Sequence, residues 1–177
     1  MKKLFTIFLV VIFGAISGSA QSPAKSTAAV GALRVEVEGG RVIAFVPSLL
    51  TKLKLPRREV KAKDHDGKEN TYSGYELREV LKLAGAKFGA DLRGANMSYY
   101  LLIEATDNYH AVFALPELDD TYTDKIVLLA DMQDGKTLDI KNGPWQVIVP
   151  DEKKHARWVR QVMTLKVIRA QPVSTIR

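Results

Sequence analysis

The fold is decided by residues 72–85, which read YSGYELREVLKLAG. The apolar residues of this stretch recur with the i, i+3, i+4, i+7 spacing of one helix face: Leu77, Val80, Leu81 and Ala84. Charged side chains occupy the other face, and Gly85 is of the residue type that commonly ends helices. The pattern predicts one short amphipathic helix that follows Gly74.

Short strands surround this helix in the sequence. The first is the clearest, because Leu33, Val35 and Val37 alternate with charged residues as in a half-buried strand. Further strands are predicted over 42–45, 58–62, 98–105, 109–114, 126–130, 145–149 and 163–168, with single helical turns after Pro47 and at Pro116. Many short strands with one good helix predict an α+β, mainly β domain.

The N-terminus has the order of a secretory signal. Lys2 and Lys3 precede an apolar run over 4–16, and small residues follow up to Ala20. The run is short for a membrane span, so we expect cleavage after Ala20; the alternative is a membrane anchor. The expected organisation is a signal peptide over 1–20, a linker over 21–32, one domain over 33–170 and a tail over 171–177. The product is expected in the periplasm or outside the cell, with membrane contact only before cleavage.

Composition excludes several classes of function. The 177 residues include no cysteine, which excludes disulfides, a lipid-anchored cysteine and a thiolate for metal binding or nucleophilic attack. Lysine and arginine number 26 against 20 acidic residues, and removing Lys2 and Lys3 leaves 24 against 20, a mildly basic domain. Acids and bases are mixed along the chain, without the basic stripe typical of nucleic-acid binding, so no nucleic-acid partner is expected.

Motifs for catalysis or metal binding are weak. The histidines His65, His110 and His155 lack the spacing of metal ligands, so we interpret them as surface or turn residues and not as a metal site with nearby aspartates. The sequence contains no glycine-rich phosphate loop after a strand and no nucleophile elbow. Asp119 and Asp120 flank a turn, where aspartate is favoured by its local backbone hydrogen bonds. No catalytic residue and no metal ligand are therefore assigned.

Three stretches, taken in order, carry a resemblance to a known family. They are residues 72–85, residues 103–118 (IEATDNYHAVFALPEL), and residues 143–150 (GPWQVIVP) followed by 157–160 (RWVR). Together they resemble the small exported relatives of the molybdopterin-binding domain of the sulfite oxidase superfamily, with Asn108 in place of a glycine. The resemblance extends from about Leu33 to Ile168 and implies a sulfite-oxidase-type molybdopterin-binding fold.

The departure from that family is the missing cysteine. Active members hold molybdenum through a thiolate on the strand before the aromatic–x–Gly element, and residues 60–65 align with that strand. Neither Asp64 nor His65 replaces a soft thiolate without changing which metal the site prefers. The signal also has Lys2-Lys3 where the family's cofactor-loaded exports carry two arginines. We expect no cofactor and interpret the chain as an accessory module, not an enzyme, that binds a small anionic ligand or a periplasmic protein. The alternative is an oxidoreductase that binds molybdopterin with non-cysteine metal ligands.

The resemblance also implies a cofactor-binding or anion-binding site near the end of the chain. In the family, the basic residue before the closing tryptophan faces the cofactor phosphate, and Arg157 matches that position. An extended segment would point Arg157 and Arg160 to opposite faces, so Arg160 is a secondary candidate. Weaker candidates for the same site are His155, Tyr109 and His110. The competing interpretation is that Trp158 belongs to the core and the cations are only solvated.

Overall fold

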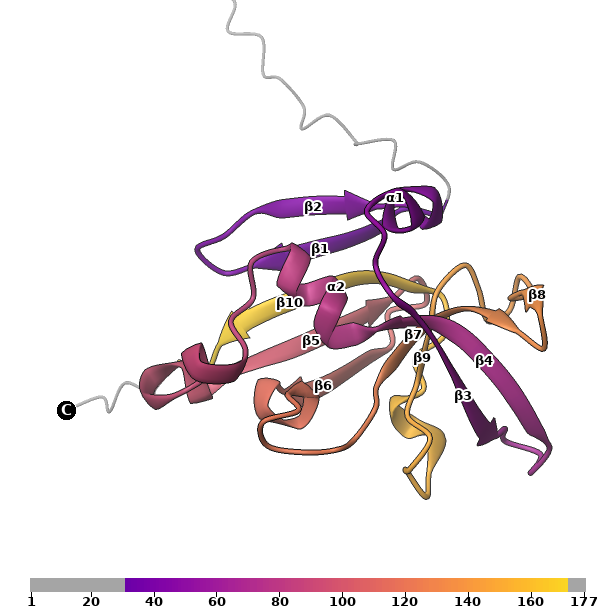
Figure 1. The fold of residues 1–177 in the computed structure, drawn as a ribbon. Helices are drawn as coiled ribbons and strands as arrows, with labels where there is room; N and C mark the ends of the chain where they lie inside the picture. Colours follow the sequence, from indigo (N-terminus) through magenta and orange to yellow (C-terminus); the bar gives the residue numbers. More distant parts are fainter. Residues whose placement is uncertain (1–30, 172–177) are drawn as a thin grey trace, which may run out of the picture.

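The computed structural model describes residues 31–171 and consists mainly of two β-sheets (Figure 1). The predicted signal peptide, most of the linker and the end of the tail lie outside these residues. The first sheet has the strand order β2-β1-β10-β5-β6. Its strands are β1 (Leu33–Val37), β2 (Val42–Phe45), β5 (Tyr99–Ala105), β6 (His110–Ala114) and β10 (Val162–Arg169). Strand β1 pairs in parallel with β10, whereas the other pairs of this sheet are antiparallel.

The second sheet has the order β3-β4-β7-β8, and β9 also pairs with β7. Its strands are β3 (Arg57–Lys63), β4 (Glu69–Glu76), β7 (Leu128–Gln133), β8 (Lys136–Thr137) and β9 (Gln146–Ile148). The helical elements are α1 (Pro47–Lys52), α2 (Leu77–Leu83), η1 (Gly89–Asp91), η2 (Gly94–Ser98), η3 (Leu115–Leu118) and η4 (His155–Arg157). This content confirms the expected α+β, mainly β class. Within residues 31–171, no helix combines the length and the apolar character of a membrane span.

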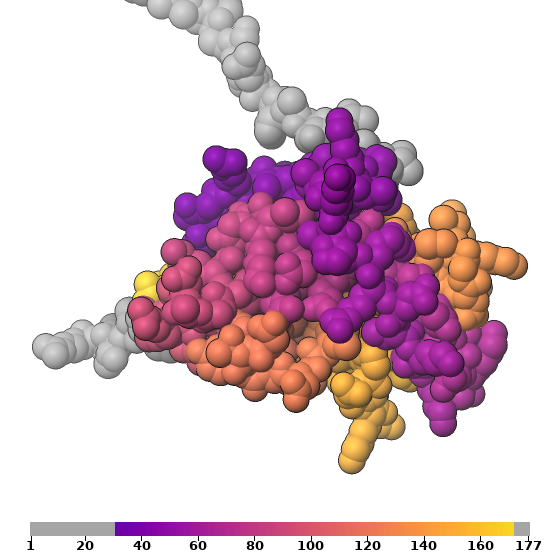
Figure 2. All heavy atoms as spheres, in the orientation of Figure 1, coloured from indigo at the N-terminus to yellow at the C-terminus, as the bar shows by residue number. Residues whose placement is uncertain are grey.

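Helix α2 begins directly after β4 and buries the predicted apolar face. Leu77, Val80 and Leu81 are fully buried, and Ala84 is nearly so. Gly85 then adopts a φ of +95°, a left-handed conformation that ends the helix and that side chains other than glycine rarely adopt. The helix and the 3-10 turns that follow it form a continuous surface between the β1–β2 hairpin and the loop after η3 (Figure 2). The helix expected from residues 72–85 is thus confirmed.

Gly74 lies where two backbones of the second sheet come unusually close. A Cβ atom at this position would lie 2.1 Å from the backbone oxygen of Leu129 and 2.6 Å from Cα of Ala130. The β4–β7 register shifts between Ser73 and Gly74, which marks a β-bulge at the same point. Glycine is required here because no side chain fits between the strands. The bulge places the end of β4 so that α2 follows with its apolar face inward.

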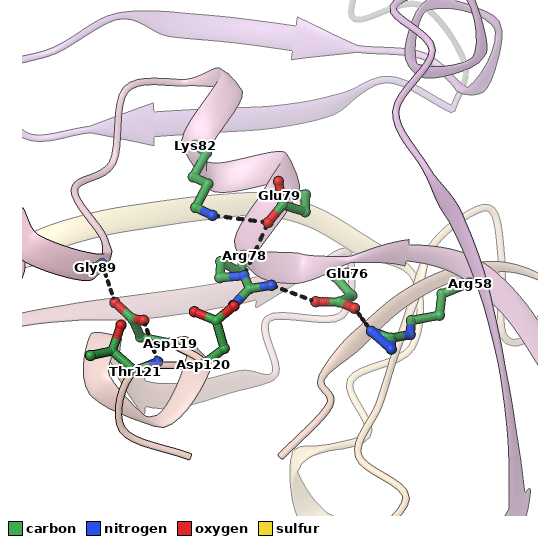
Figure 3. Close-up of polar contacts among 9 residues, drawn as sticks. All are labelled: Arg58, Glu76, Arg78, Glu79, Lys82, Gly89, Asp119, Asp120 and Thr121. Atoms are coloured by element: carbon green, nitrogen blue, oxygen red, sulfur yellow. Dashed lines mark hydrogen bonds and ion pairs between the residues drawn. The ribbon is translucent and has the colours of Figure 1, made fainter. Parts of the chain in front are cut away.

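Ion pairs and backbone contacts fix the loops around α2 (Figure 3). Arg78 pairs with Glu76 at 3.2 Å, with Glu79 at 3.0 Å and with Asp120 at 2.5 Å, so it joins the helix to the loop after η3. The buried carboxylate of Asp119 accepts hydrogen bonds from the backbone N–H of Gly89 at 2.5 Å and of Thr121 at 2.9 Å. Burial alone would raise the pKa of Asp119, but these bonds favour the charged form and lower the pKa below its ordinary value. Arg78 and Asp119 are therefore bonded to other parts of the fold.

Candidate functional site

A large open cavity of about 880 Å³ lies at the ends of several strands. Its walls come from the β3–β4 turn, the β5–β6 turn, the end of β7, the start of β9 and the segment around η4. The lining residues are Asp64, His65, Asp66, Tyr72, Asp107, Tyr109, Gln133, Lys141, Asn142, Gln146, His155, Ala156, Trp158, Val159, Arg160 and Gln161. Turns that are far apart in sequence therefore meet at one concave surface, a common setting for ligand sites.

Gln161 fastens three of these walls together. Its Nε2 donates to the backbone oxygen of Ile140 at 2.7 Å, and its Oε1 accepts from the hydroxyl of Thr106 at 2.8 Å. Its backbone N–H donates to the oxygen of Asn142 at 2.9 Å, while its own oxygen accepts from the N–H of Thr106 at 3.1 Å. The loop before β9, the β5–β6 turn and the chain after η4 are consequently held in one arrangement.

The β5–β6 turn makes a second contact with the segment around η4. The hydroxyl of Tyr109 donates to the backbone oxygen of Ala156 at 2.6 Å. Asn108, which precedes Tyr109, has a φ of +70°, a conformation that asparagine tolerates better than most residues. Asparagine therefore suits this position of the turn.

An aromatic group forms one wall of the cavity. The ring of Trp158 lies 4.2 Å from that of His155 and meets the ring of Tyr72 edge-on at 5.7 Å, both measured between ring centroids. The indole N–H of Trp158 donates to the backbone oxygen of Val149 at 3.0 Å. Trp158 is only 8% exposed, and since its donor is already used, the small part that reaches the cavity is carbon surface.

Gln146 is a buried polar residue of the cavity lining, and its side-chain oxygen accepts no hydrogen bond from the described residues. Its neighbours Trp145 and Val147 are fully buried in the core, and because side chains alternate along a strand, Gln146 faces the other way, into the cavity. The residue is only 6% exposed, and its Oε1 has no hydrogen-bond partner among the described residues. A buried acceptor without a partner is destabilising, and this oxygen has almost no surface accessible from the cavity.

The charged side chains around the cavity differ in how many hydrogen bonds and ion pairs they form within the protein. Asp64 accepts hydrogen bonds from the side chain of Asn70 at 2.8 Å and from two backbone N–H groups of its own turn, and the bond from Asn70 is the main cause of its lowered pKa. Asp107 likewise accepts from the N–H of Tyr109. Arg160 and Lys141 are exposed and have no ion-pair partner among residues 31–171. Asp66 is likewise exposed in the lining, and its carboxylate forms no ion pair among these residues, so the open charges of the cavity are two cations and one carboxylate.

The structure brings three of the five predicted site residues together. Arg160, His155 and Tyr109 line the cavity, whereas Arg157 and His110 do not. The extended conformation expected before the last strand is wrong, because residues 155–157 form the 3-10 turn η4, closed by a bond from the N–H of Trp158 to the oxygen of His155. Arg160, the secondary candidate, is therefore the arginine at the cavity.

Arg157 points instead toward β6 and η3. Its guanidinium lies 4.0 Å above the ring of Phe113 and donates to Glu117 at 3.0 Å and to Glu152 at 2.8 Å. Desolvation would lower its pKa, but these two carboxylates raise it above its ordinary value. His110 lies on the outer side of β6, with its Nε2 3.8 Å from Glu104. Both residues are occupied by contacts within the protein.

Gln146, Tyr72 and Lys141 belong to the cavity but were not among the predicted site residues. The sequence does hold one signal for Gln146, because it is a single polar residue within the apolar run 145–149. A polar residue in such a run either faces a cavity or needs a buried partner. Across residues 31–171, no cluster of three or more histidine, aspartate or glutamate side chains is arranged to hold a metal ion.

Comparison with known proteins identifies a fold and no family. No model of a known protein family matches the sequence, and no curated protein matches it. Among solved structures, the chain is similar to the sulfane dehydrogenase SoxCD from Paracoccus pantotrophus, with a TM-score of 0.60 and 18% sequence identity. The match covers 77% of this chain but 38% of that chain, so this protein corresponds to well under half of the enzyme subunit. At this level of identity the similarity concerns the fold alone.

Proposed function

We propose that this protein is an exported accessory module with the molybdopterin-binding fold of the sulfite oxidase superfamily, and that its cavity binds a small anionic ligand. The fold similarity to a sulfane dehydrogenase supports the architecture. The single observation that carries the binding role is the cavity itself, where turns that are far apart in sequence meet at one concave surface. Arg160 and Lys141 at the same cavity form no ion pair among the described residues, so they are the groups that could hold a negative charge on a ligand, beside the carboxylates of Asp64, Asp66 and Asp107.

The residues of the cavity do not fit a molybdenum–thiolate centre. The sequence has no cysteine, and the carboxylates and histidines near Asp64 are hard or borderline donors with a different metal preference. Arg157, which the family resemblance assigns to the cofactor phosphate, is held by Glu117 and Glu152. We therefore propose a role in binding and not in molybdenum catalysis.

Anion binding is tested by titrating the protein with inorganic phosphate and sulfate while recording amide NMR spectra. Shifts should gather on the cavity residues, and Arg160→Gln should weaken binding about three- to tenfold through the loss of one charge-assisted contact. Arg41→Gln removes another exposed arginine that does not line the cavity and should leave binding unchanged. Shifts scattered over the surface, or equal effects of the two variants, would contradict the proposal.

Export and cofactor content are tested on protein isolated from the cell that makes it. An intact mass beginning at Gln21 would support export with cleavage after Ala20, whereas a mass that includes residues 1–20 would favour a membrane anchor. Denaturation should release no fluorescent pterin, and elemental analysis should find no stoichiometric molybdenum. Release of a pterin would favour the alternative, an oxidoreductase with non-cysteine metal ligands.

A further inference from the structure

We propose that two copies of this chain pair through the free edge of β2 and join their five-stranded first sheets into one continuous sheet. β2 lies at the outer end of the first sheet (Figure 1), and none of its residues lines the cavity, so the pairing does not depend on the proposed ligand. Three observations support it: the direction of the backbone groups along β2, the protection of other outer strands, and a register that two β2 strands can share.

The backbone groups of Val42 and Ala44 face away from the rest of the sheet. Along β1, residues that bond to β10 alternate with residues that bond to β2. Glu38, directly after β1, belongs to the first set, because its N–H donates to the oxygen of Val167 on β10 at 2.9 Å. Val42 and Ala44 lie opposite residues of that same set. Their N–H and C=O groups therefore point outward, and these groups form no hydrogen bond within residues 31–171.

Two other outer strands of the molecule are protected against an added strand. On β3, the bond from the N–H of Asp64 to the oxygen of Lys68 at 2.8 Å shows which residues face β4. The residues that alternate with them face the free edge, and all of them are charged: Arg57, Glu59, Lys61 and Lys63. Charged side chains at an edge discourage strand pairing. On β6, Arg157 and Glu117 bond to the outward backbone groups. Of these three outer strands, only β2 has uncharged residues with unoccupied backbone groups at its edge.

One symmetric register uses the outward groups of both copies. When Ile43 of one copy lies opposite Ile43 of the other, Val42 lies opposite Ala44 on both sides of the axis, and each such pair exchanges N–H···O bonds. Val42 is 57% exposed and would bury apolar area against Ala44 of the second copy. Arg34 lies beside Ala44, and Glu36 lies beside Val42. Unlike charges from the two copies would thus flank the apolar contact, and no like charges would meet.

The shortness of this edge favours a second copy over a flexible peptide. β2 has four residues, and Pro47, which has no N–H, begins α1 directly after Val46. A flexible peptide would lose about 1–2 kcal/mol of backbone entropy for each residue that it orders, in return for few hydrogen bonds. A second β2 is already held as a strand by its own β1, so most of this entropy is lost before the two copies meet.

Single cysteines test the register, because the natural chain has no cysteine. In the proposed register the two residues 43 form a non-hydrogen-bonded pair with Cα atoms about 4.5 Å apart, which a disulfide can span. Mild oxidation of the exported protein carrying Ile43→Cys should therefore give a covalent dimer on a non-reducing gel. Val112→Cys is the control, because Val112 is also an exposed valine, 48% exposed, on the outer strand at the opposite end of the same sheet. It should stay mainly uncrosslinked.

Matched lysine substitutions at the same two strands test the dimer without a crosslink. Sedimentation of the wild-type protein over a range of concentrations should show a dimer. Val42→Lys should raise the Kd of this dimer by about tenfold or more, because it places a charge at the paired edge, whereas Val112→Lys should leave the Kd unchanged. In hydrogen exchange, the amides of Val42 and Ala44 should gain protection as the protein concentration rises, while those of Lys61 and Lys63 should not.

Three results would overturn the proposal. The first is a wild-type protein that stays monomeric even at about 1 mM. The second is a dimer that Val42→Lys and Val112→Lys weaken equally, or that Ile43→Cys does not crosslink. The third is protection of the Val42 and Ala44 amides that is independent of concentration, which would mean that another part of the same chain, outside the described residues, covers this edge.

Discussion

Arg157 and Glu117 form an ion pair of 3.0 Å along the free edge of β6. The same guanidinium donates to the backbone oxygen of Val112 at 3.2 Å, and the same carboxylate accepts from the N–H of Ala114 at 3.0 Å. Val112 and Ala114 are alternate residues of an edge strand, so these two groups face away from β5. The ion pair therefore occupies backbone positions that an added strand would otherwise use.

Arg157→Ala should destabilise the domain and open this edge. We expect the free energy of unfolding to fall by about 1–2 kcal/mol, from the lost contact with Phe113 and the carboxylates left without a partner. The variant should also self-associate at concentrations where the wild-type protein is a single species, because Val112 and Ala114 become available for strand pairing. Denaturant titration and light scattering measure the two effects.

Lys154→Ala serves as the control, since Lys154 is an exposed cation close to Arg157 in sequence without an ion pair in the described chain. It should change neither stability nor self-association. Should Arg157→Ala instead weaken phosphate binding while leaving stability intact, Arg157 would belong to the anion site as the family resemblance implies.

Gly74→Ala should be among the most damaging single-methyl additions in this protein. The new Cβ atom would meet backbone atoms of Leu129 and Ala130, which cannot rotate away as a side chain can. We expect a loss of about 3 kcal/mol or more, together with a disturbed β4–β7 pairing. Gly40→Ala is the control and should cost clearly less, because its new Cβ atom would lie 3.2 Å from both Cβ and the backbone oxygen of Val37, in an exposed turn. The two variants should be compared by thermal unfolding. Similar losses of stability would mean that the strands can separate at Gly74 and would contradict the prediction.

The sequence predicts the parts of this fold that depend on near neighbours. The alternation of Leu33, Val35 and Val37 is enough to predict β1, and the spacing of Leu77 and Leu81 is enough to predict α2, because each element buries one face. The β4–β7 bulge cannot be predicted in this way. It depends on how closely Gly74 approaches Leu129, a partner 55 residues later in the chain, which no local pattern reports.

The candidate site is less predictable for the same physical reason. Tyr109, His155 and Arg160 were predicted from the hairpin and the closing segment, but the turn at η4 decides which arginine faces the cavity. That turn is fixed by contacts of Arg157 with β6 and η3, which are distant in sequence. The sequence marks Gln146 only as a single polar residue in an apolar run, and that its Oε1 has no partner is known only from the structure.

Leu81→Ala should cost about 2–5 kcal/mol of stability, the usual range for truncating a buried leucine. Leu81 is fully buried on the core face of α2, so the substitution leaves a cavity that the surrounding strands cannot fill. Leu83→Ala is the control within the same helix, since Leu83 is 39% exposed and should cost less than about 1 kcal/mol. Chemical denaturation measures both, and an equal cost would mean that the helix face is assigned incorrectly.

Asp119 should make the protein less stable in acid. Its pKa is lowered in the folded state because the N–H groups of Thr121 and Gly89 bind the charged carboxylate more than burial disfavours it. A lowered pKa contributes stability above the pKa of the unfolded chain, near about 4, and that stability is lost as the pH falls through the folded value. Asp119→Asn should thus lower the free energy of unfolding by about 1–3 kcal/mol at pH 7, and the difference from wild type should shrink below about pH 4.

Asp120→Asn is the control, because it removes one negative charge from the same loop without touching the buried carboxylate. Asp120 is the neighbouring aspartate, and its side chain is 71% exposed in its pair with Arg78. Such a surface pair contributes less than about 1 kcal/mol, so this variant should follow the wild-type pH curve closely. Asp64, whose pKa is also lowered, is unchanged in both variants and cannot produce a difference between them. The decisive measurement is denaturant unfolding of the three proteins from pH 7 to pH 3. A difference between Asp119→Asn and wild type that stays constant over this range would mean that the carboxylate charge contributes nothing, and that Asp119 holds Gly89 and Thr121 only by its shape.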